Sequence, residues 1–313
     1  MRLSVTGGSG FIGSHVVRHL RQAGHEVQNI DLNGPDAKAV DICDTKALAQ
    51  AYSEFLPECV FHLAGIADAR DALQNPTKAV TINVGGTASV LEAARKSGIK
   101  RVIIASTCWV ANAMGNGALD ETSPFLPAGG GHVYTTTKIA SELLAYDFNR
   151  LYGLSFTILR YGIPYGPGMW SGLVLKNFLD NAAAGKPLTI FGDGSASRRF
   201  VYVEDLARAH VLALQDVATN QVYNLEGMRF VTVKELAEVF RKLWGTGVEI
   251  LYRPEPTRIG EFAYFRKLIS SGKAYIDLGW EPRIDLEEGV RRVVEAYRAE
   301  VMEKPGAVVE AVR

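Results

Sequence analysis

The order of apolar and polar positions predicts a chain of alternating strands and helices. Short apolar runs rich in β-branched residues predict buried strands, and apolar residues three and four positions apart predict helices. In the first half, the expected strands are residues 2–6, 26–31, 59–63, 101–106 and 155–160, and the expected helices are 11–23, 45–55, 77–97 and 136–152. This alternation favours an α/β fold with a doubly wound parallel sheet.

The pattern changes after residue 160. A turn-rich junction at 162–168 contains three glycines and two prolines. Beyond it, helices are expected at 173–184, 203–214 and 233–243, a strand at 188–191, and a loose tail after 303. We therefore expect a first domain over 1–165 with a return segment near 198–225. A smaller lobe over 166–313 would be partly interleaved with it.

Composition narrows the class of protein. The 313 residues are 47% hydrophobic, and 34 basic residues balance 34 acidic ones. This balance gives no electrostatic reason to expect a nucleic acid or an anionic membrane as the main partner. No run reaches the roughly 18 apolar residues of a membrane helix, and the chain begins with a strand, so we expect a cytoplasmic protein. Cys43, Cys59 and Cys108 lack metal-ligand spacing and are expected to be reduced thiols, with no metal site.

A glycine-rich loop, TGGSGFIG at 6–13, lies between the first expected strand and helix. Gly7 permits the tight turn, Gly10 lets the backbone approach a pyrophosphate, and Gly13 lets the helix pack on the strand. The N–H groups at the helix N-terminus would then bind the phosphates. The loop therefore predicts a dinucleotide site in a Rossmann-type fold.

An acidic residue at the end of the second strand predicts which dinucleotide binds. The Asp31 carboxylate can accept hydrogen bonds from ribose hydroxyls and would repel the additional phosphate of NADP. We therefore expect NAD as the cofactor. Asp41 and Ile42, which follow the next short apolar run, are expected beside the adenine.

Tyr134 and Lys138 form a candidate acid–base pair. They are four residues apart at the start of an expected helix and therefore share one helical face. A tyrosine normally holds its proton to about pH 10, but a cation about 6 Å away, at an effective dielectric of about 20, contributes roughly 2.8 kcal/mol. We therefore expect Lys138 to lower the pKa of Tyr134 by about two pH units. Tyr134 could then act as a base toward a sugar hydroxyl.

A hydroxyl at the end of the fourth expected strand would complete this pair. Ser106 and Thr107 both lie there, and doubly wound sheets bind ligands at the carboxyl ends of their strands. Two histidines belong to the same motifs. We expect His62, at another strand end, to be a packing residue, and His132 remains an alternative contact to the substrate.

Together these motifs resemble the extended short-chain dehydrogenase/reductases of the NAD-dependent epimerase/dehydratase family, close to UDP-glucose 4-epimerases. The similarity runs nearly from end to end. The segments that carry it are TGGSGFIGSH at 6–15, FHLAG at 61–65, NVGGT at 83–87, AST at 105–107, YTTTK at 134–138, LRYGIPYGP at 159–167, FGDGSASRRFVYVEDLA at 191–207 and LGW at 278–280. They are specific for the family and much less specific for the reaction.

The resemblance implies a role for each site residue. Thr107 aligns with the family's catalytic serine or threonine, Tyr134 with the base, and Lys138 with the residue that binds the nicotinamide ribose. Arg198 and Arg258 resemble arginines that hold the nucleotide diphosphate. The expected cofactor contacts are Gly7, Gly10, Phe11, Ile12, Gly13, Asp31, Asp41, Ile42, Leu63, Ala64, Gly65, Lys138 and Tyr161. The expected substrate contacts are Thr107, Cys108, Trp109, Tyr134, Arg198 and Arg258.

The chain departs from the family pattern beside Thr107. Relatives usually continue with two small or acidic residues and then Val-Tyr-Gly, whereas here the sequence is CWVAN at 108–112. Two asparagines that relatives use to bind substrate are replaced by Ile163 and Val174. Trp109 could stack on a sugar face or only fill a gap.

Three functions remain open from the sequence. The first is a nucleotide-sugar 4-epimerase that oxidises C4 transiently and returns the hydride. The second is another reaction of the family: 4,6-dehydration, decarboxylation or 4-keto reduction. The third is a dinucleotide sensor without turnover. Family dehydratases carry an Asp-Glu pair after the threonine, and decarboxylases a glutamate where Trp109 stands, so the epimerase is favoured. The resemblance also implies a homodimer joined through the helices at 77–97 and 136–152.

Overall fold

The computed structural model describes residues 1–34, 36–111, 117–126, 131–245, 247–255 and 267–303. Contacts within the chain divide it into two compact units. The first contains Met1–Gly162, Leu206–Glu226 and Gly260–Glu281, and the second contains Ile163–Asp205, Gly227–Ile259 and Pro282–Arg313. The chain therefore returns to the first unit twice, whereas the sequence predicted one return near 198–225.

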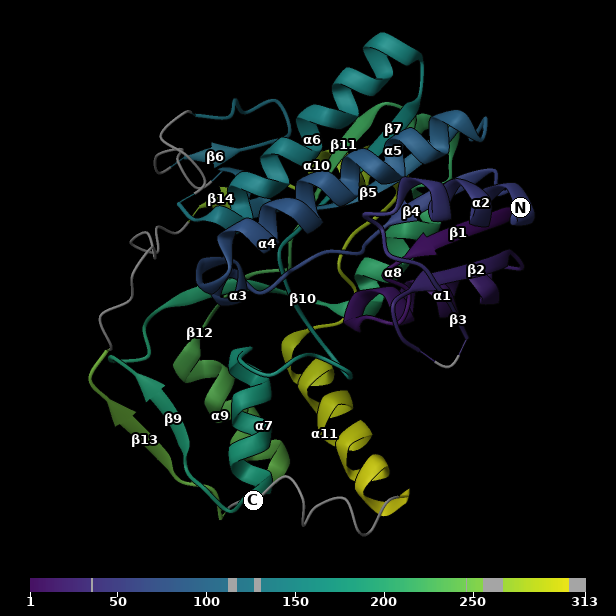
Figure 1. The fold of residues 1–313 in the computed structure, drawn as a ribbon. Coiled ribbons are helices and arrows are strands. Elements are labelled where there is room, and N and C mark those ends of the chain that lie inside the picture. Colours follow the sequence, from purple (N-terminus) through teal and green to yellow (C-terminus); the bar gives the residue numbers. More distant parts are fainter. Residues whose placement is uncertain (35, 112–116, 127–130, 246, 256–266, 304–313) are drawn as a thin grey trace. The chain divides into compact units, whose positions relative to one another are not determined.

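The first unit is built on a seven-stranded parallel sheet (Figure 1). In spatial order its strands are β11 (Gln221–Leu225), β7 (Ser155–Tyr161), β5 (Arg101–Thr107), β4 (Cys59–His62), β1 (Arg2–Thr6), β2 (Glu26–Asp31) and β3 (Ala37–Ala39). The chain moves outward from β1 to β3 and then crosses to β4 on the other side of β1. A ligand crevice is expected at this switch point, outside the carboxyl ends of β1 and β4. The predicted doubly wound fold is confirmed, although both edge strands, β3 and β11, were missed.

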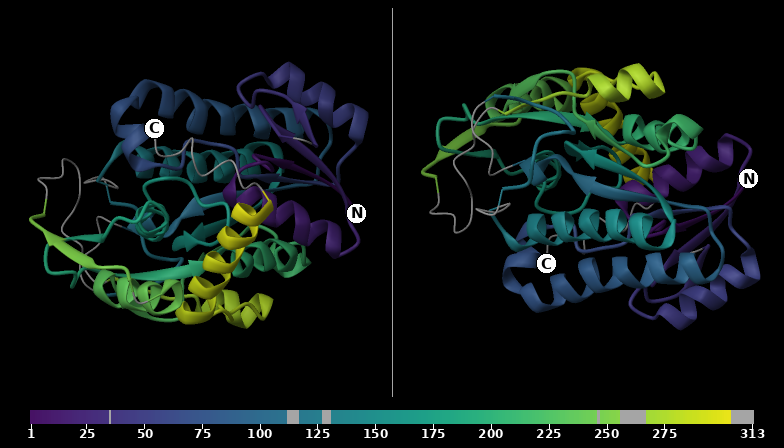
Figure 2. Two further views of the ribbon diagram at one scale, coloured as in Figure 1. Left: turned by 90° about the horizontal axis from the view of Figure 1, so that it is seen from below. Right: turned by 90° about the horizontal axis from the view of Figure 1, so that it is seen from above.

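Helices cover both faces of this sheet (Figure 2). α2 (Thr45–Phe55), α5 (Gly86–Lys96) and α6 (Val133–Tyr152) pack side by side on one face. The other face carries α1 (Phe11–Gln22) and α8 (Val203–Leu212), whose His210 ring lies 5.9 Å from the ring of Phe61 in β4. The apolar sides of α2, α5 and α6 and the strands that they cover form one core cluster.

The expected helix at 77–97 is interrupted. A π-helical turn, η1 (Thr81–Gly85), joins α4 (Pro76–Val80) to α5. The carbonyl oxygen of Asn83 accepts hydrogen bonds from the hydroxyls of Thr87, at 2.5 Å, and Ser141, at 3.1 Å. Side-chain donors to a helix carbonyl commonly accompany such local changes of helical hydrogen bonding. The prediction of one continuous α-helix was wrong, because apolar spacing does not report which carbonyls side chains bind.

Among its described residues, the second unit contains two small sheets and three helices. β8 (Ile163–Tyr165), β10 (Ser197–Tyr202) and β12 (Phe230–Thr232) form one sheet, and β9 (Leu188–Phe191) pairs with β13 (Ile250–Arg253). The helices are α7 (Val174–Ala183), α9 (Val233–Trp244) and α11 (Leu286–Glu303), with α9 packed against the other two. Of these elements, the sequence predicted β9, α7 and α9.

Shorter elements complete the described chain. They are α3 (Ala69–Gln74), the 3-10 turns η2 (Cys108–Ala111) and η3 (Asp216–Ala218), the paired strands β6 (Ala118–Leu119) and β14 (Leu268–Ile269), and α10 (Gly272–Leu278). Within the residues that the structure describes, none of the helices has the length and apolar character needed to span a bilayer.

Candidate active site

The glycine loop lies against the residues that follow β4, and its shape requires glycine at two positions. Gly7 has a φ of 77°, and a Cβ there would lie 2.5 Å from the backbone nitrogen of Ala64. A Cβ on Gly13 would lie 1.9 Å from the carbonyl oxygen of Gly7. α1 begins after Gly10 without a side-chain cap. The loop therefore has the close-packed form and the helix start that a bound phosphate group uses.

Asp31 connects the end of β2 to this loop. Its Oδ2 accepts a hydrogen bond from the Ser9 N–H at 3.0 Å, and its Oδ1 accepts one from the Leu32 N–H at 2.8 Å. Each carboxylate oxygen can accept a further bond, and the side chain is only partly buried. The residue is thus held in place and still able to accept hydroxyl donors.

The two residues expected beside adenine have different settings. Asp41 is exposed and accepts a hydrogen bond from the Cys43 N–H at 2.8 Å. Ile42 is buried against α5, where a Cβ on Gly86 would lie 2.5 Å from the Ile42 Cδ1. Ile42 therefore serves the packing of α5, whatever it contributes to a ligand.

Thr107, Tyr134 and Lys138 come together at the carboxyl end of β5. Thr107 is the last residue of this strand, and its Oγ1 accepts a hydrogen bond from the Trp109 N–H at 3.2 Å. The Tyr134 hydroxyl is hydrogen-bonded to Thr107. Lys138 donates from Nζ to the Ala105 carbonyl oxygen at 3.0 Å. Two hydroxyls and one ammonium group thus lie at a single strand end.

The start of α6 holds the tyrosine in place. His132 is its N-cap, and His132 Nδ1 accepts a hydrogen bond from the Thr135 N–H at 3.2 Å. This cap satisfies a backbone donor that the first turn would otherwise leave without a helical partner. α6 begins three residues before the predicted start, so Tyr134 lies inside its first turn.

The pKa of Tyr134 differs from the expected value. Desolvation raises its pKa to about 12, and the hydrogen bond with Thr107 offsets only part of this rise. Desolvation also lowers the pKa of Lys138 to about 8, against the opposing effect of the Glu142 carboxylate. The expected lowering of the Tyr134 pKa by Lys138 is therefore wrong for this structure, because the loss of hydration on burial disfavours the charged phenolate.

An aromatic group borders the tyrosine. The ring of Trp109 contacts His132 edge to face, with centroids 5.1 Å apart, and lies 6.2 Å from the ring of Tyr134. The His132 and Tyr134 rings are 5.9 Å apart. Trp109 is only partly buried, so part of its indole surface remains open.

Two expected contact residues have buried side chains. The Cys108 thiol donates to the Arg160 carbonyl oxygen at 3.3 Å and packs against Leu119 and Ile269. The Tyr161 hydroxyl forms a hydrogen bond of 2.7 Å with His210. Burial leaves neither side chain a free surface, so any ligand contact here would have to come from the backbone.

Three further residues complete the comparison with the sequence. His62 is buried between the hydroxyls of Thr6, at 2.8 Å, and Thr87, at 3.0 Å, which confirms its packing role. Arg198 lies in β10 of the second unit and donates to the Ser197 carbonyl oxygen at 2.8 Å. Arg258 lies outside the residues that the structure describes.

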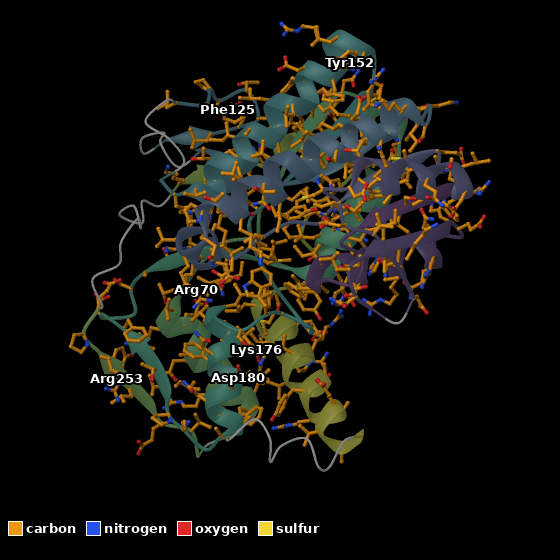
Figure 3. All side chains as sticks on the ribbon, viewed as in Figure 1. Arg70, Phe125, Tyr152, Lys176, Asp180 and Arg253 are labelled. Carbon is orange, nitrogen blue, oxygen red and sulfur yellow. The ribbon has the colours of Figure 1, made fainter. Side chains whose placement is uncertain are left out.

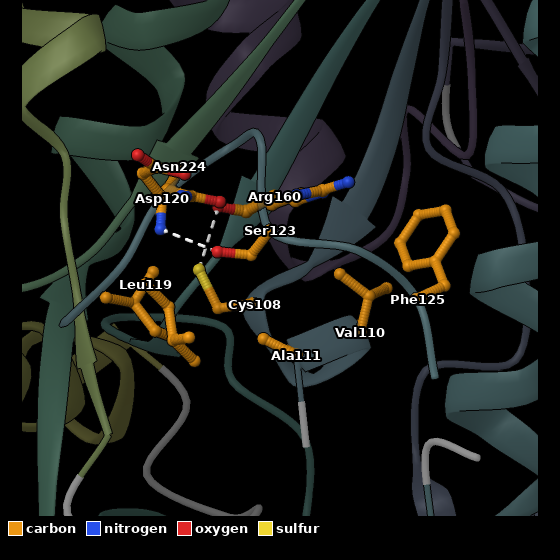
Figure 4. Close-up of a pocket in the computed structure, with 10 residues that line it drawn as sticks. Cys108, Val110, Ala111, Leu119, Asp120, Ser123, Phe125, Arg160 and Asn224 are labelled. Atoms are coloured by element: carbon orange, nitrogen blue, oxygen red, sulfur yellow. Dashed lines mark hydrogen bonds between the residues drawn. The ribbon is translucent and has the colours of Figure 1, made fainter. Parts of the chain in front are cut away.

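A small cavity lies beyond Cys108 (Figure 4). It measures about 250 Å³ including space open to solvent, and Cys108, Leu119, Ser123, Phe125, Arg160 and Asn224 are among its lining residues. The Ser123 hydroxyl accepts a hydrogen bond from the Asp120 N–H at 3.1 Å. The lining is thus partly apolar, and some of its polar groups already form hydrogen bonds with one another.

The sequence did not reveal a buried pair beneath Lys138. Glu142 lies one helical turn after Lys138 and forms an ion pair of 2.7 Å with Arg160 of β7. The sequence did show that Tyr134, Lys138 and Glu142 lie four residues apart and so share one face of the helix. This spacing alone could not identify the ion pair, because it is equally typical of a helix face exposed to solvent.

Known proteins resemble most of the chain. The model of the NAD dependent epimerase/dehydratase family matches residues 3–225. A relative from Methanocaldococcus jannaschii, provisionally named a UDP-glucose 4-epimerase, is 35% identical over 310 residues, which cover 93% of this chain and 96% of the relative.

Solved structures of the same kinds of enzyme also resemble this chain. A UDP-glucose 4-epimerase from Thermotoga maritima, solved with UDP-glucose, has a TM-score of 0.86 and 32% identity, and the match covers 96% of this chain and 100% of that one. A dTDP-glucose 4,6-dehydratase from Streptomyces venezuelae, solved with NAD, has a TM-score of 0.85 and 28% identity over 97% and 99% of the two chains. This chain therefore belongs to the NAD-dependent epimerase/dehydratase family of extended short-chain dehydrogenase/reductases.

Proposed function

We propose that this protein is an NAD-dependent nucleotide-sugar 4-epimerase. The observation that carries the proposal is the meeting of Thr107, Tyr134 and Lys138 at one strand end. Oxidation of an alcohol removes a hydride from carbon and a proton from oxygen. A proton-accepting hydroxyl near a dinucleotide loop suits this reaction.

The residues around the glycine loop fit NAD. The loop provides the close backbone approach for a pyrophosphate, and Asp31 is placed to accept ribose hydroxyls. Lys138 would bind the nicotinamide ribose. When bound, NAD would accept a hydride from C4 and return it, and its positive ring would favour ionisation of the nearby tyrosine.

The protein's own groups would move the proton. Tyr134 would take the proton from the O4 hydroxyl of the sugar, while Thr107 donates a hydrogen bond to O4. Because the Trp109 N–H already donates to Thr107 Oγ1, the hydroxyl hydrogen of Thr107 remains available as a donor. After the 4-keto sugar presents its other face, Tyr134 would return the proton to O4.

The residues after Thr107 favour epimerisation over two related reactions. Dehydration and decarboxylation in this family use carboxylates there, whereas this chain has the buried thiol of Cys108 and the indole of Trp109. Simple 4-keto reduction is the second candidate. It would use the same three residues, and the bulk of Trp109 beside Tyr134 could hinder the turning of the sugar that epimerisation requires.

The nucleotide diphosphate would be bound by arginine. A guanidinium group can form paired, charge-assisted hydrogen bonds with phosphate oxygens. Arg198 and Arg258 are proposed for this role on family resemblance.

The test uses purified protein supplied with NAD and a panel of UDP- and dTDP-sugars. We expect product NMR to show interconversion at C4 without accumulation of NADH. Tyr134→Phe should lower kcat by about 10³-fold or more while NAD still binds, because the phenol that exchanges the proton is lost. A 4-keto-6-deoxy or pentose product, or near-normal kcat in Tyr134→Phe, would contradict the proposal.

A homodimer and a cytoplasmic location complete the proposal. The helices expected at the interface include α6, which exposes Leu143, Tyr146 and Tyr152, with exposed fractions of 50%, 41% and 55% (Figure 3 labels Tyr152). Apolar surface of this kind on one helix suits an interface with a second copy. Light scattering that shows a monomer at micromolar concentration would refute the dimer.

A further inference from the structure

A fully bonded ion pair is buried beside the proposed catalytic residues. Glu142 of α6 is wholly buried, and Arg160 of β7 is 4% exposed. Arg160 donates from Nε and Nη2 to both carboxylate oxygens, over 2.7 to 3.2 Å. The Ser106 hydroxyl donates to Glu142 Oε1 at 2.5 Å. Burial of such a pair is costly and often adds little stability, so its presence calls for a role beyond holding the fold.

The position of Glu142 relates it to all three proposed catalytic groups. Tyr134, Lys138 and Glu142 are spaced by four residues along α6 and therefore share one face. Ser106, which donates to Glu142, directly precedes Thr107 at the end of β5. One carboxylate thus joins the helix that carries the tyrosine and lysine to the strand that carries the threonine.

We propose that Glu142 is a positioning residue for the reaction, whose buried negative charge holds α6 against the end of β5 and keeps Lys138 protonated. This inference rests on the proposed function, which makes Lys138 part of the site. Arg160 has the supporting role of pairing with the buried Glu142 carboxylate, since an unpaired buried charge is costly.

The surroundings of Lys138 support this role. Desolvation lowers the pKa of Lys138 to about 8, and the Glu142 carboxylate acts in the opposite direction. His62 supplies no compensating charge, because burial lowers its pKa to about 3 and leaves it neutral. The other groups facing this part of α6 are the protonated phenol of Tyr134, the neutral side chains of Asn83 on η1 and Thr87 on α5, and the cationic Arg160 on β7 behind Glu142. Among these described groups, Glu142 carries the negative charge.

The decisive variant is Glu142→Gln, which keeps the size of the side chain and its acceptor oxygen but removes the charge. The pKa of Lys138 can be measured without turnover, by NMR of the protein with ¹³C-dimethylated lysines, with the Lys138 signal assigned by its absence in Lys138→Arg. We expect its midpoint to move down by about one to two pH units. The basic limb of the kcat profile should move down by the same amount, with KM nearly constant, because turnover needs protonated Lys138.

Ser106→Ala is the matched control. It removes a hydrogen bond to the same carboxylate and leaves the charge, so we expect kcat to fall while the Lys138 midpoint and the basic limb keep their wild-type positions. A purely structural role would predict the same response in both variants. An unchanged Lys138 midpoint in Glu142→Gln overturns the inference.

A second variant covers the case in which Glu142→Gln does not fold. Glu142→Gln combined with Arg160→Met leaves no unpaired buried charge. The Lys138 midpoint should still fall, and a wild-type value overturns the inference. The NMR measurement is independent of turnover, so it separates this inference from the proposed function, which Tyr134→Phe tests.

Discussion

At the residue scale, Asp31 is a carboxylate that the protein has already oriented. Two backbone N–H groups, from Ser9 and Leu32, hold it at the end of β2. If the Asp31 carboxylate accepts hydrogen bonds from the ribose hydroxyls, its negative charge would repel the additional phosphate that NADP carries on this ribose. If Asp31 selects the cofactor as proposed, its side chain is held in position by the protein itself before any ligand binds.

The corresponding prediction concerns cofactor choice. Asp31→Ala should narrow the preference for NAD over NADP by about 10- to 100-fold, which corresponds to one or two hydrogen bonds to a charged group. The measurement is the Kd of each dinucleotide by fluorescence titration, with Asp41→Ala as the control for loss of a nearby exposed carboxylate. Equal wild-type affinity for the two cofactors would exclude this role for Asp31.

Trp109 is the second residue with a testable role. Its edge contacts with His132 and Tyr134 leave part of the indole open beside the proposed acid–base group. We expect it to stack on the sugar. Trp109→Ala should then raise KM for the nucleotide-sugar by about tenfold, as expected for a lost aromatic contact of 1–2 kcal/mol.

The control is the nucleotide diphosphate without sugar, whose Kd by calorimetry should stay near the wild-type value. If KM is unchanged in Trp109→Ala, the indole only fills a gap. A rise in kcat instead would show that its bulk hinders the turning of the sugar and would favour the 4-keto reductase.

At the element scale, the C-caps of α2 and α6 share the same left-handed conformation but are different residues. The C-cap of α2 is Leu56, with a φ of 54° and an exposed fraction of 62%, and the C-cap of α6 is Gly153, with a φ of 71°. A Cβ is strained in this conformation, so glycine is favoured there. A Cβ added at Gly153 would meet no other atom within 4 Å. Any loss of stability in Gly153→Ala would therefore come from the strained backbone conformation.

A reciprocal pair of variants tests this difference. Leu56→Gly should raise the free energy of unfolding by about 0.5–1 kcal/mol, and Gly153→Ala should lower it by about 1 kcal/mol. Urea unfolding followed by circular dichroism measures both, with an unchanged slope expected because neither change alters the buried surface greatly. A lower free energy of unfolding in Leu56→Gly would show that the packing of the Leu56 side chain stabilises the fold by more than the left-handed backbone conformation costs.

At the scale of the whole molecule, two buried histidines connect stability to pH. Burial lowers the pKa of His62 to about 3 and that of His210 to about 4, from an ordinary 6.5. Below pH 6.5 these two histidines are protonated in the unfolded chain but stay neutral in the folded chain. The free energy of unfolding therefore falls as the pH falls. This loss of stability occurs between pH 6.5, the ordinary histidine pKa, and the pKa values of about 3 and 4 that His62 and His210 have in the folded chain.

We therefore expect each histidine to reduce the free energy of unfolding by about 2 kcal/mol between pH 7 and pH 5. Urea unfolding at the two pH values gives the loss in wild type. The double variant His62→Gln, His210→Gln should lose about 4 kcal/mol less over this interval. An equal loss in wild type and double variant would assign the acid sensitivity to other groups.

The sequence by itself determined the features that depend on near neighbours. The alternation of strand and helix patterns predicted the doubly wound sheet, because each element must bury its own apolar side. The glycine loop before α1 and the four-residue spacing of Tyr134 and Lys138 were readable for the same reason, since turn geometry and helical faces are set within a few residues. The family assignment followed from these local motifs and is confirmed by the comparisons. The proposed roles of the site residues stay predictions.

Tertiary structure alone decided the features that depend on distant partners. The edge strand β11 is short and is defined by its pairing with β7, more than 60 residues earlier in the chain. The pKa of Tyr134 is set by how much water the folded chain removes, which no spacing rule reports. Glu142 likewise looks like an ordinary helical glutamate until β5 and β7 bring Ser106 and Arg160 against it. Desolvation and long-range contact, rather than residue identity, give these groups their properties.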